Sequence, residues 1–382
     1  MHILFISRGY PSAQRPQNGN FEVDQAEGLV KLGHKVSMIS VDLGREFIPK
    51  EFGIQRIQKN GVLSYHCFFI PMKFFPGEGI FRKLLNMQLD YLYQKVVQEA
   101  GKPDIIYAHY LWNSDWALFF KNKYHIPLVG IEHWSELGYD EIKPIIEKNA
   151  RRIYPQLDKL IVVSHTLQRK IQERFGIKAD VVFNTIHDIV KVLPAPPRAD
   201  DIVRFITTGT LLPVKGYDNL ITAFAQCPLP RDKWNLTIIG EGPEEQNLKT
   251  LIVQYHLENN IRLAGRKNKD EVVEALNQSD VFISSSHLET FGVAALEAIC
   301  CGIPVLATDS GGPREFITKK NGILCDDNIE ALQQGIEYMF HHYKDYDRKV
   351  IADDCRAHFS SEVIAKQLTA IFEDVVAKHK QR

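Results

Sequence analysis

The sequence lacks a marked excess of charge of either sign. Its 46 lysine and arginine residues nearly balance 47 aspartate and glutamate residues, which leaves a formal net charge of −1. A protein that binds nucleic acid usually carries a strong basic excess, so we expect no nucleic-acid partner. The 382 residues are 45% hydrophobic and 24% charged, which is ordinary globular composition. A chain of this length has room for two domains.

Long apolar runs and paired cysteines are also missing. No run of about 18 apolar residues occurs, so no transmembrane helix is indicated. Residues 1–7 lack the basic-then-apolar order of a signal peptide. Without a C-x-x-C pair, neither a zinc knuckle nor a dithiol redox motif is indicated. Scattered thiols favour a reducing compartment, and we expect a cytoplasmic protein. The six cysteines are Cys67, Cys227, Cys300, Cys301, Cys325 and Cys355.

Two nucleotide-binding signatures are absent as well. No Gly-x-Gly-x-x-Gly follows the first apolar run, which disfavours a nicotinamide-dependent enzyme. No Gly-x4-Gly-Lys-[Ser/Thr] occurs, which argues against a nucleoside triphosphatase.

Short apolar runs alternate with segments of helical length along the whole chain. Strands that alternate with helices are typical of βαβ units, which form mainly parallel sheets. Two such series predict two doubly wound α/β domains. The runs of the first series are 2–7, 35–41, 62–70, 104–108, 127–131, 159–163 and 180–183, and those of the second are 202–208, 234–239, 260–264, 280–284, 303–307 and 322–325.

A proline-rich segment at 188–201 separates the two series. Three prolines within four residues can continue neither a helix nor a central strand. We therefore expect a linker at 188–201, between a domain of residues 1–187 and a domain of residues 202–360. From residue 361 apolar residues recur at helical spacing, which predicts a last helix at 361–382.

Residues 72–100 leave two interpretations open. Apolar residues such as Phe81 stand beside basic residues such as Lys83, as in a helix that rests on an anionic membrane surface. The alternative is an ordinary helix packed on the sheet. The acidic residues Glu78 and Asp90 interrupt the basic face and favour this alternative.

The predicted strand at 281–284 leads into a predicted helix. Thr290 is a suitable N-cap for this helix, and Gly302 follows its end. The first N–H groups, around residues 291–293, lack partners inside the helix and, with the helix dipole, form a site for an anion. Gly292 lets a phosphate come close to the backbone.

Two glutamates flank that predicted phosphate site. Glu289 lies in the loop before the helix, and Glu297 lies two turns into it. A carboxylate would repel a phosphate, so these side chains suit the hydroxyl groups that flank a diphosphate, ribose on one side and a sugar on the other. The alternative for Glu297, an ordinary surface position, is disfavoured by the strand, cap and glycine around it.

A lysine lies in a second loop between a strand and a helix. Lys215 follows the run at 202–208 and precedes the helix predicted at 219–225, and the loop also contains Gly209 and Gly216. A lysine so placed can neutralise a leaving diphosphate. A solvated loop lysine is the alternative.

The Glu-x7-Glu spacing in this context resembles the retaining glycosyltransferases of family 4. The resemblance implies the GT-B fold, in which two Rossmann-like, doubly wound domains face a central cleft. It implies that Glu297 binds the ribose of a nucleoside-diphosphate-sugar donor and that Glu289 lies by the transferred sugar. The diphosphate would be held by the backbone of Phe291, Gly292 and Val293.

The lysine loop resembles the family's Gly-Arg-x5-Lys-Gly segment with one departure. Gly209, Lys215 and Gly216 match, but Thr210 stands at the arginine position. One of the two usual diphosphate cations is therefore missing at its place. The cations that could substitute for it are Arg266, Arg8 and Arg15.

The resemblance is close from about residue 202 to residue 325 and looser in the first domain. Arg266 ends a segment similar to the one whose backbone contacts the nucleobase. Gly19 matches the glycine that opens the first helix, in a loop that faces the donor phosphates. His109 follows the run at 104–108, where a histidine of the family contacts the donor sugar.

Other features of the first domain match only in part. His133 lies at the next strand end, and a ligand contact and a buried structural role remain equally open for it. Asn184 is the one residue kept from the family's Asn-Gly-Val-Asp turn. By the resemblance, the last helix packs back on the first domain.

The resemblance implies a retaining, metal-independent hexosyl transfer from a nucleoside-diphosphate sugar, such as a UDP-sugar, to a saccharide or lipid-linked acceptor. Such a reaction belongs to polysaccharide or glycolipid synthesis, and Glu289, His109 and Lys215 would be the catalytic residues. We expect no cofactor, and no Asp-x-Asp ends an apolar strand to hold a metal. Peripheral contact with the inner face of the membrane would suit a lipid-linked acceptor. The alternatives are a nucleotide-sugar epimerase of the same architecture and a non-catalytic nucleotide-sugar-binding partner subunit.

Overall fold

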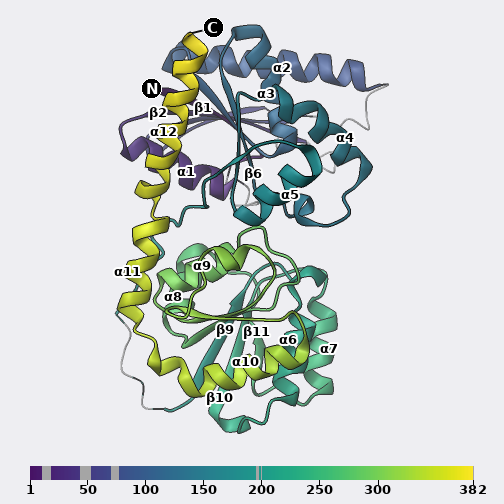
Figure 1. Ribbon diagram of the computed structural model, residues 1–382, viewed down its shortest axis with the longest axis vertical. Coiled ribbons are helices and arrows are strands. Elements are labelled where there is room, and N and C mark those ends of the chain that lie inside the picture. Colours follow the sequence, from purple (N-terminus) through teal and green to yellow (C-terminus); the bar gives the residue numbers. More distant parts are fainter. Residues whose placement is uncertain (11–18, 44–52, 70–76, 195–197, 199, 382) are drawn as a thin grey trace. The chain divides into compact units, whose positions relative to one another are not determined.

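A computed structural model describes residues 1–10, 19–43, 53–69, 77–194, 198 and 200–381. They form two compact units (Figure 1). The first unit is Met1–Thr185 with Ser361–Arg382, and the second is Ile186–Ser360. The segment 188–201, expected as the linker, counts with the second unit in this division. Its residues 195–197 and 199 lie outside the described part of the chain.

The first unit contains an eight-stranded sheet in the order β3-β4-β2-β1-β5-β6-β7-β8. Neighbouring strands run parallel, apart from β3, which pairs antiparallel with β4. The strands are β1 (His2–Ser7), β2 (Lys35–Leu43), β3 (Ile54–Lys59), β4 (Val62–Phe69), β5 (Ile105–His109), β6 (Leu128–Glu132), β7 (Lys159–Val162) and β8 (Asp180–Val181). The helices are α1 (Asn20–Lys31), α2 (Glu78–Ala100), α3 (Leu111–Tyr124), α4 (Pro144–Ile153), α5 (His165–Phe175) and α12 (Ser361–Lys380).

The central strands of this sheet are covered on both faces. Every residue of β1, β5 and β6 is buried. Because successive side chains of a strand point to opposite faces, full burial requires packing on both sides of the sheet. This is why these strands appear in the sequence as continuous apolar runs.

The second unit contains a six-stranded parallel sheet in the order β11-β10-β9-β12-β13-β14. Its strands are β9 (Val203–Thr208), β10 (Trp234–Ile239), β11 (Ile261–Leu263), β12 (Val281–Ser284), β13 (Val305–Thr308) and β14 (Gly322–Cys325). Its helices are α6 (Tyr217–Gln226), α7 (Glu245–Gln254), α8 (Lys269–Asn277), α9 (Val293–Cys300), α10 (Ile329–His342) and α11 (Arg348–Phe359). Counted from β9, this is the 3-2-1-4-5-6 order of a Rossmann fold, and the prediction of two doubly wound domains is confirmed.

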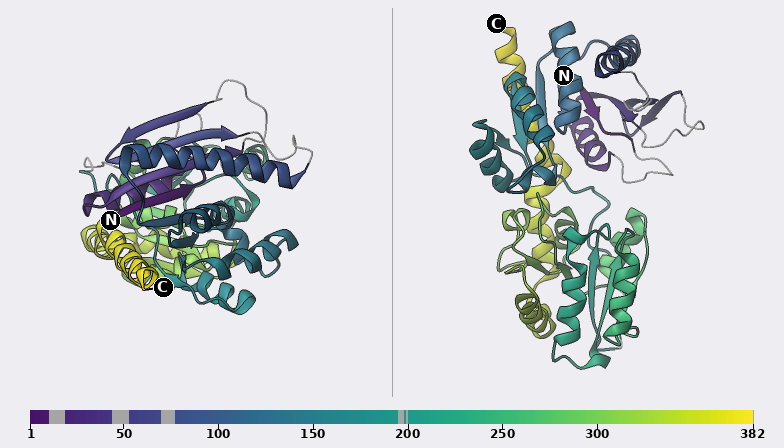
Figure 2. Two further views of the ribbon diagram at one scale, coloured as in Figure 1. Left: turned by 90° about the horizontal axis from the view of Figure 1, so that it is seen from above. Right: turned by 90° about the vertical axis from the view of Figure 1, so that its right-hand side faces the viewer.

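The last helix belongs to the first unit, although it is the most distant part in sequence. α12 lies alongside α1 (Figures 1 and 2). A side chain at Gly28 would come within 2.9 Å of the Ser361 carbonyl oxygen, so the two helix backbones approach closely. His34 Nε2 and Thr369 Oγ1 are 2.9 Å apart. The first unit is therefore assembled from both ends of the chain.

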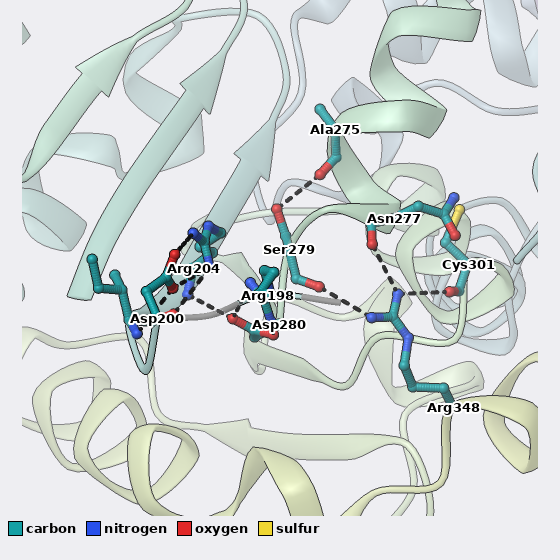
Figure 3. A network of polar contacts seen from close by, with 10 residues as sticks. Arg198, Asp200, Arg204, Ala275, Asn277, Ser279, Asp280, Cys301 and Arg348 are labelled. Atoms are coloured by element: carbon teal, nitrogen blue, oxygen red, sulfur yellow. Dashed lines mark hydrogen bonds and ion pairs between the residues drawn. The ribbon is translucent and has the colours of Figure 1, made fainter. Parts of the chain in front are cut away.

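A polar network at the amino ends of β9 and β12 holds the start of the second unit (Figure 3). The buried carboxylate of Asp280 accepts hydrogen bonds from the Arg198 guanidinium and, at 2.9 Å, from the Arg204 backbone N–H. Arg348, at the start of α11, donates to the Ser279 and Cys301 carbonyl oxygens at 3.5 and 3.4 Å. The contacts join the segment before β9 to the elements around the sheet.

A disulfide joins α9 to α11. Cys300 and Cys355 are bonded, with Cα atoms 5.5 Å apart and a sequence separation of 55. Both side chains are buried. The expectation of six scattered free thiols is therefore wrong for this pair. No short-range pattern in the sequence indicates the bond, because the packing of α9 on α11 brings the cysteines together.

Candidate active site

The polar residues of the second unit gather where its strand order reverses. β9 and β12 are neighbours, although β10 and β11 lie between them in sequence. Such a switch point opens a crevice at the carboxyl ends of the strands, where α/β sheets bind ligands. A small pocket lies there, and its lining includes Thr207, Thr208, Lys215, Tyr217, Ser284, Ser285, Ser286, Glu289 and Gly292.

The helix beside this pocket starts later than expected. α9 begins at Val293, and its N-cap is Gly292 with φ of 94°, a left-handed conformation that favours glycine. The expectation that Thr290 is the N-cap is therefore wrong. The unpaired N–H groups of the first turn belong to Val293 and the residues after it, rather than to Phe291. The positive end of the helix dipole faces the same side as these groups.

Lys215 and Glu289 contact each other at the pocket. Lys215 Nζ lies 2.6 Å from Glu289 Oε1, and Ser286 Oγ donates to the same oxygen at 2.9 Å. Only 25% of the Lys215 side chain and 17% of the Glu289 side chain is exposed. Two loops that are 74 residues apart thus place one cation and one carboxylate side by side.

Glu297 has a cationic partner as well. It lies on α9, and its Oε1 is 3.3 Å from Nζ of Lys269, the first residue of α8. The carboxylate is 17% exposed. Lys269 carries no signal in the sequence, because nothing local relates it to a residue on another helix.

Lys215 is the only basic side chain among the described residues that line the pocket. Arg266 forms an ion pair with Glu241 at 2.9 Å. A side chain at Gly209 would come within 2.7 Å of Tyr217 Oη, so this loop packs tightly against α6. The exposed Thr210 supplies no charge.

Arg8 and Arg15 of the first unit are the other candidates for the missing diphosphate cation. Arg8 Nε donates to Glu22 Oε1 at 3.2 Å, and its guanidinium lies 4.0 Å from the centre of the Tyr110 ring. Arg15 lies outside the described residues. Gly19, at the end of the same loop, is the N-cap of α1 with φ of 79°. A side chain there would come within 2.3 Å of the Gly9 carbonyl oxygen.

The first unit has a switch point of its own between β1 and β5. His109, the last residue of β5, is fully buried there. Its Nδ1 lies 3.3 Å from His133 Nε2, and His133 Nδ1 lies 3.0 Å from Asn184 Oδ1. Burial holds the pKa of His109 well below its usual range, and burial together with His109 lowers the pKa of His133 to about 3.

A buried carboxyl group next to His133 was not anticipated. Glu132 ends β6 and is 1% exposed. Desolvation raises its pKa to about 8, against the hydrogen bond that Tyr154 Oη donates to Glu132 Oε1 at 3.2 Å. A glutamate directly after an apolar run is a signal that sequence analysis could have used.

Two properties of the described part of the chain bear on membranes and metal ions. Within it, no helix combines the length and the apolar character needed to cross a bilayer. The same residues include no group of three or more histidine, cysteine, aspartate or glutamate side chains arranged to hold a metal ion.

The fold defines the class of protein. Two doubly wound units with polar residues at their switch points are the architecture of GT-B glycosyltransferases. The structure of sucrose-phosphate synthase from Thermosynechococcus elongatus matches 99% of this chain and 100% of that chain, with a TM-score of 0.79 and 18% identity.

Sequence comparison then identifies the family. Residues 21–188 match the family described as Glycosyltransferase Family 4, and residues 194–352 match the family described as Glycosyl transferases group 1. The chain belongs to glycosyltransferase family 4 and is a glycosyltransferase.

Two curated relatives show how broad this family is. One is a component of human phosphatidylinositol N-acetylglucosaminyltransferase, to which the chain is 25% identical over 334 residues, 86% of this chain and 66% of that protein. The other is N-acetyl-alpha-D-glucosaminyl L-malate synthase of Bacillus anthracis, with 25% identity over 304 residues, 74% of this chain and 78% of that protein. The chain thus spans about two thirds of the length of the human relative.

Proposed function

We propose that the protein transfers a hexosyl group from a nucleoside-diphosphate sugar to a saccharide or lipid-linked acceptor, with retention of configuration and without a metal ion. The observation that carries this proposal is the contact between Lys215 and Glu289 beside the start of α9. It puts a cation, a carboxylate and unpaired helix N–H groups at one switch point.

In the proposed reaction the bond between the anomeric carbon and the diphosphate breaks, and negative charge grows on the leaving oxygen. Lys215 and the first N–H groups of α9, from Val293 on, stabilise that charge. The Lys215 ammonium forms an ion pair with Glu289. A bound diphosphate would compete for the same ammonium.

Positive charge grows on the sugar ring at the same time, because the transition state resembles an oxocarbenium ion. A carboxylate near the ring favours this charge, and Glu289 is proposed for that role. The acceptor oxygen then bonds to the anomeric carbon, and the leaving diphosphate takes up the hydroxyl proton of the acceptor. Glu297, on α9, is proposed to bind the ribose hydroxyl groups, with Lys269 holding its carboxylate.

The choice of acceptor class rests on the relatives. The human protein is named for transfer to phosphatidylinositol and the Bacillus protein for a product of L-malate, so related chains serve lipid and small polar acceptors. A lipid-linked acceptor is favoured by one surface feature of this chain. Four apolar side chains of α2 are exposed at helical spacing: Ile80, Leu84, Met87 and Tyr91. We propose that this α2 stripe makes peripheral contact with a membrane.

Exchange of Glu289 for glutamine tests the proposal. Glu289→Gln keeps the shape of the side chain and removes its charge, so transfer from a sugar nucleotide to a competent acceptor should fall by about 10²-fold or more. Glu245→Gln, on the exposed surface of α7, is the matched control and should leave transfer unchanged. Unchanged transfer in Glu289→Gln would contradict the catalytic assignment.

Two alternatives give different results in the same assay. An epimerase converts the donor without any acceptor, so product analysis after incubation with donor alone identifies it. A non-catalytic partner subunit binds the donor and transfers nothing in a broad acceptor screen. The human relative is named as one component of an enzyme, which is why the second alternative is included in the test.

A further inference from the structure

The second unit contains a larger hollow away from the candidate active site. Its lining runs from Arg204 in β9 through Asn235 and Thr237 in β10 to Arg262 in β11, and it also includes residues of α7 and α8. We call it the β10–β11 hollow. Its volume is about 850 Å³, and it shares no lining residue with the pocket at the switch point. Cavities that bind small ligands have volumes of about 300–1,000 Å³, so this hollow is large enough for one.

The order of the strands explains why a hollow lies on this part of the sheet. α8 follows β11 and precedes β12, so it crosses back over the sheet and contacts β9. On the other face, Leu236 and Ile238 of β10 are buried in a hydrophobic cluster with residues of α6, α7 and α10. Asn235 and Thr237 alternate with them and are only partly buried. The hollow therefore lies on the polar face of β10.

The strand register places polar side chains of three strands side by side. Arg204 of β9 pairs with Asn235 of β10, and Thr237 of β10 pairs with Arg262 of β11. Residues two apart on a strand point to the same face, so Asn235 and Thr237 share one face with their partners. A guanidinium group on each neighbouring strand thus flanks the amide and the hydroxyl group of β10.

These four side chains differ in whether they already have partners. The Asp200 carboxylate accepts hydrogen bonds from the Arg204 guanidinium at 3.0 and 2.7 Å (Figure 3). Arg262 is exposed, and its side chain has no ion pair and no hydrogen bond with the described residues. Within the same part of the chain, the side chains of Asn235 and Thr237 have no hydrogen bond either. Their donors and acceptors, and the five N–H groups of Arg262, are available to a ligand.

The charged residues of the lining favour an anionic ligand. The basic residues are Arg204, Lys249 and Arg262, and the acidic residue is Glu258. Arg204 and Lys249 each pair with a carboxylate outside the lining. Arg262 is therefore the basic residue whose charge is left for a ligand. A guanidinium binds carboxylate and phosphate groups well, because two of its N–H groups can donate in parallel.

The neighbours of Arg262 favour a saccharide over a peptide strand or a nucleic acid. β11 is an edge strand of three residues, which offers little backbone for another strand to pair with. The described residues of the lining include no aromatic side chain on which a base could stack. Asn235 and Thr237 can each donate and accept a hydrogen bond, which suits the hydroxyl groups of a sugar.

We propose that the β10–β11 hollow binds an acidic saccharide, with Arg262 on its acidic group and with Asn235 and Thr237 on its hydroxyl groups. The choice of a saccharide rests on the proposed function, because a transferase that extends an acidic glycan gains from holding its acceptor or product away from the donor site. The contact of Arg262 with an anion does not rest on that function, since it follows from the unpaired guanidinium in the hollow.

Calorimetric titration of the intact protein tests the class of ligand. The acidic probes are trigalacturonate and glucose 6-phosphate, and their neutral counterparts are the methyl ester of trigalacturonate and glucose. We expect at least one acidic probe to bind more tightly than its neutral counterpart and more tightly than inorganic phosphate, which has no sugar hydroxyl groups. Its affinity should fall as the salt concentration rises.

Variants show whether the probe occupies the hollow. Arg262→Gln removes the guanidinium, and it should weaken binding of the acidic probe about tenfold or more, as for the loss of a hydrogen bond to a charged group. Asn235→Asp keeps the size of the side chain and adds a negative charge, which should weaken binding of the same probe. Arg356→Gln, at an exposed position on α11 outside the hollow, is the control and should bind like wild type.

The outcomes separate this proposal from the proposed function. Equal binding by wild type and Arg262→Gln overturns the acidic-saccharide site, and so does a failure of both acidic probes to bind. Tighter binding of inorganic phosphate or of a phosphoserine peptide overturns it as well. If Arg262→Gln does not fold, Asn235→Asp decides. If the probe binds in the hollow but no sugar is transferred, the proposed function fails and the site stands; transfer without probe binding has the opposite meaning.

Discussion

Among single residues, Glu132 offers a stability test that is independent of activity. Its carboxyl group has a pKa of about 8 in the folded chain, against 4.5 for an unperturbed glutamate. Above about pH 4.5 the unfolded chain releases this proton while the folded chain keeps it. Folding therefore becomes less favourable as the pH rises from about 4.5 to 8, and the stability present at low pH is lost over that window.

Replacing Glu132 with glutamine should remove this pH dependence. Glutamine keeps an oxygen that can accept from Tyr154 and has no charge to bury. Relative to Glu132→Gln, the wild type should lose a few kcal/mol of unfolding free energy between about pH 5 and pH 8, at about 1.4 kcal/mol per pKa unit. Urea unfolding of both proteins at these two pH values measures the loss of unfolding free energy. The Glu147→Gln variant, at an exposed position, is the control. Parallel pH profiles of wild type and Glu132→Gln would show that the pKa of Glu132 is not raised.

The candidate active site shows which functional features can be recognised from the sequence and which cannot. Lys215 and Glu289 could be selected because each lies in a loop with local signals, glycines and a strand before it. The hydrogen bonds that join His109, His133 and Asn184 could not be predicted, because they link residues 24 and 51 positions apart. Thr290 was chosen as a cap by residue type, but the backbone conformation at Gly292 decides where α9 starts.

Among the helices, α9 and α11 are joined by a bond whose contribution can be measured. In the chain-entropy account, closing a loop of 55 residues stabilises the fold by about 4 kcal/mol. Reduction of Cys300–Cys355 should therefore lower the urea midpoint of the second unit. The Cys300→Ser, Cys355→Ser double variant should match the reduced protein and not respond to reductant. Cys227→Ser, which affects an unbonded thiol, is the control. If reductant leaves the urea midpoint of the wild type unchanged, the disulfide does not form in solution.

A second helix that can be tested is α2, with its exposed stripe. The opposite face of α2 is buried, which agrees with the packed helix favoured in the sequence analysis, yet Met87 and Ile80 are 60% and 51% exposed. If the stripe enters a membrane surface, the Ile80→Ser, Met87→Ser double variant should bind anionic phospholipid vesicles several-fold more weakly, because burying such side chains is worth about 1.5–3 kcal/mol each. Sedimentation with vesicles measures this.

The matched control for the α2 stripe is Val253→Ser. Val253 is 56% exposed on α7 in the second unit and has no comparable stripe around it. Equal vesicle binding by wild type, the double variant and the control would remove the support for membrane contact. Loss of binding in the control alone would place the contact on the other unit.

The strands show where apolar patterning succeeds and where it fails. Runs 2–7, 234–239 and 322–325 coincide with β1, β10 and β14. For β1, which is buried along its whole length, the reason is that a buried parallel strand needs apolar residues on both faces. β3 was missed, since it is an antiparallel edge strand with mostly exposed side chains and no apolar run. β8, predicted at 180–183, is only two residues long.

For the whole molecule, the division into two units separates the proposed tasks. The residues proposed to bind the donor nucleotide all lie within Ile186–Ser360. They are Lys215, Glu297 and the first residues of α9. The buried histidines His109 and His133 lie within the first unit, which the last helix completes. The tasks could be assigned from sequence because each series of strands forms its own sheet. The packing of α12 on the first unit was expected only from the family resemblance, since a sequence pattern does not show which sheet a helix covers.

Hydrogen exchange of the intact chain tests this division of tasks. A nucleoside diphosphate without a sugar, with UDP, GDP and ADP as probes, should protect backbone amides at 207–216 and 289–297, since a ligand at about 100 times its Kd adds about 2.7 kcal/mol to the free energy of local opening. Amides around His109 should not change. Glu297→Ala should weaken the protection at the same ligand concentration by removing the ribose contact. Protection confined to the first unit would show that the nucleotide binds there, and the assignment of the donor site to the second unit would be wrong.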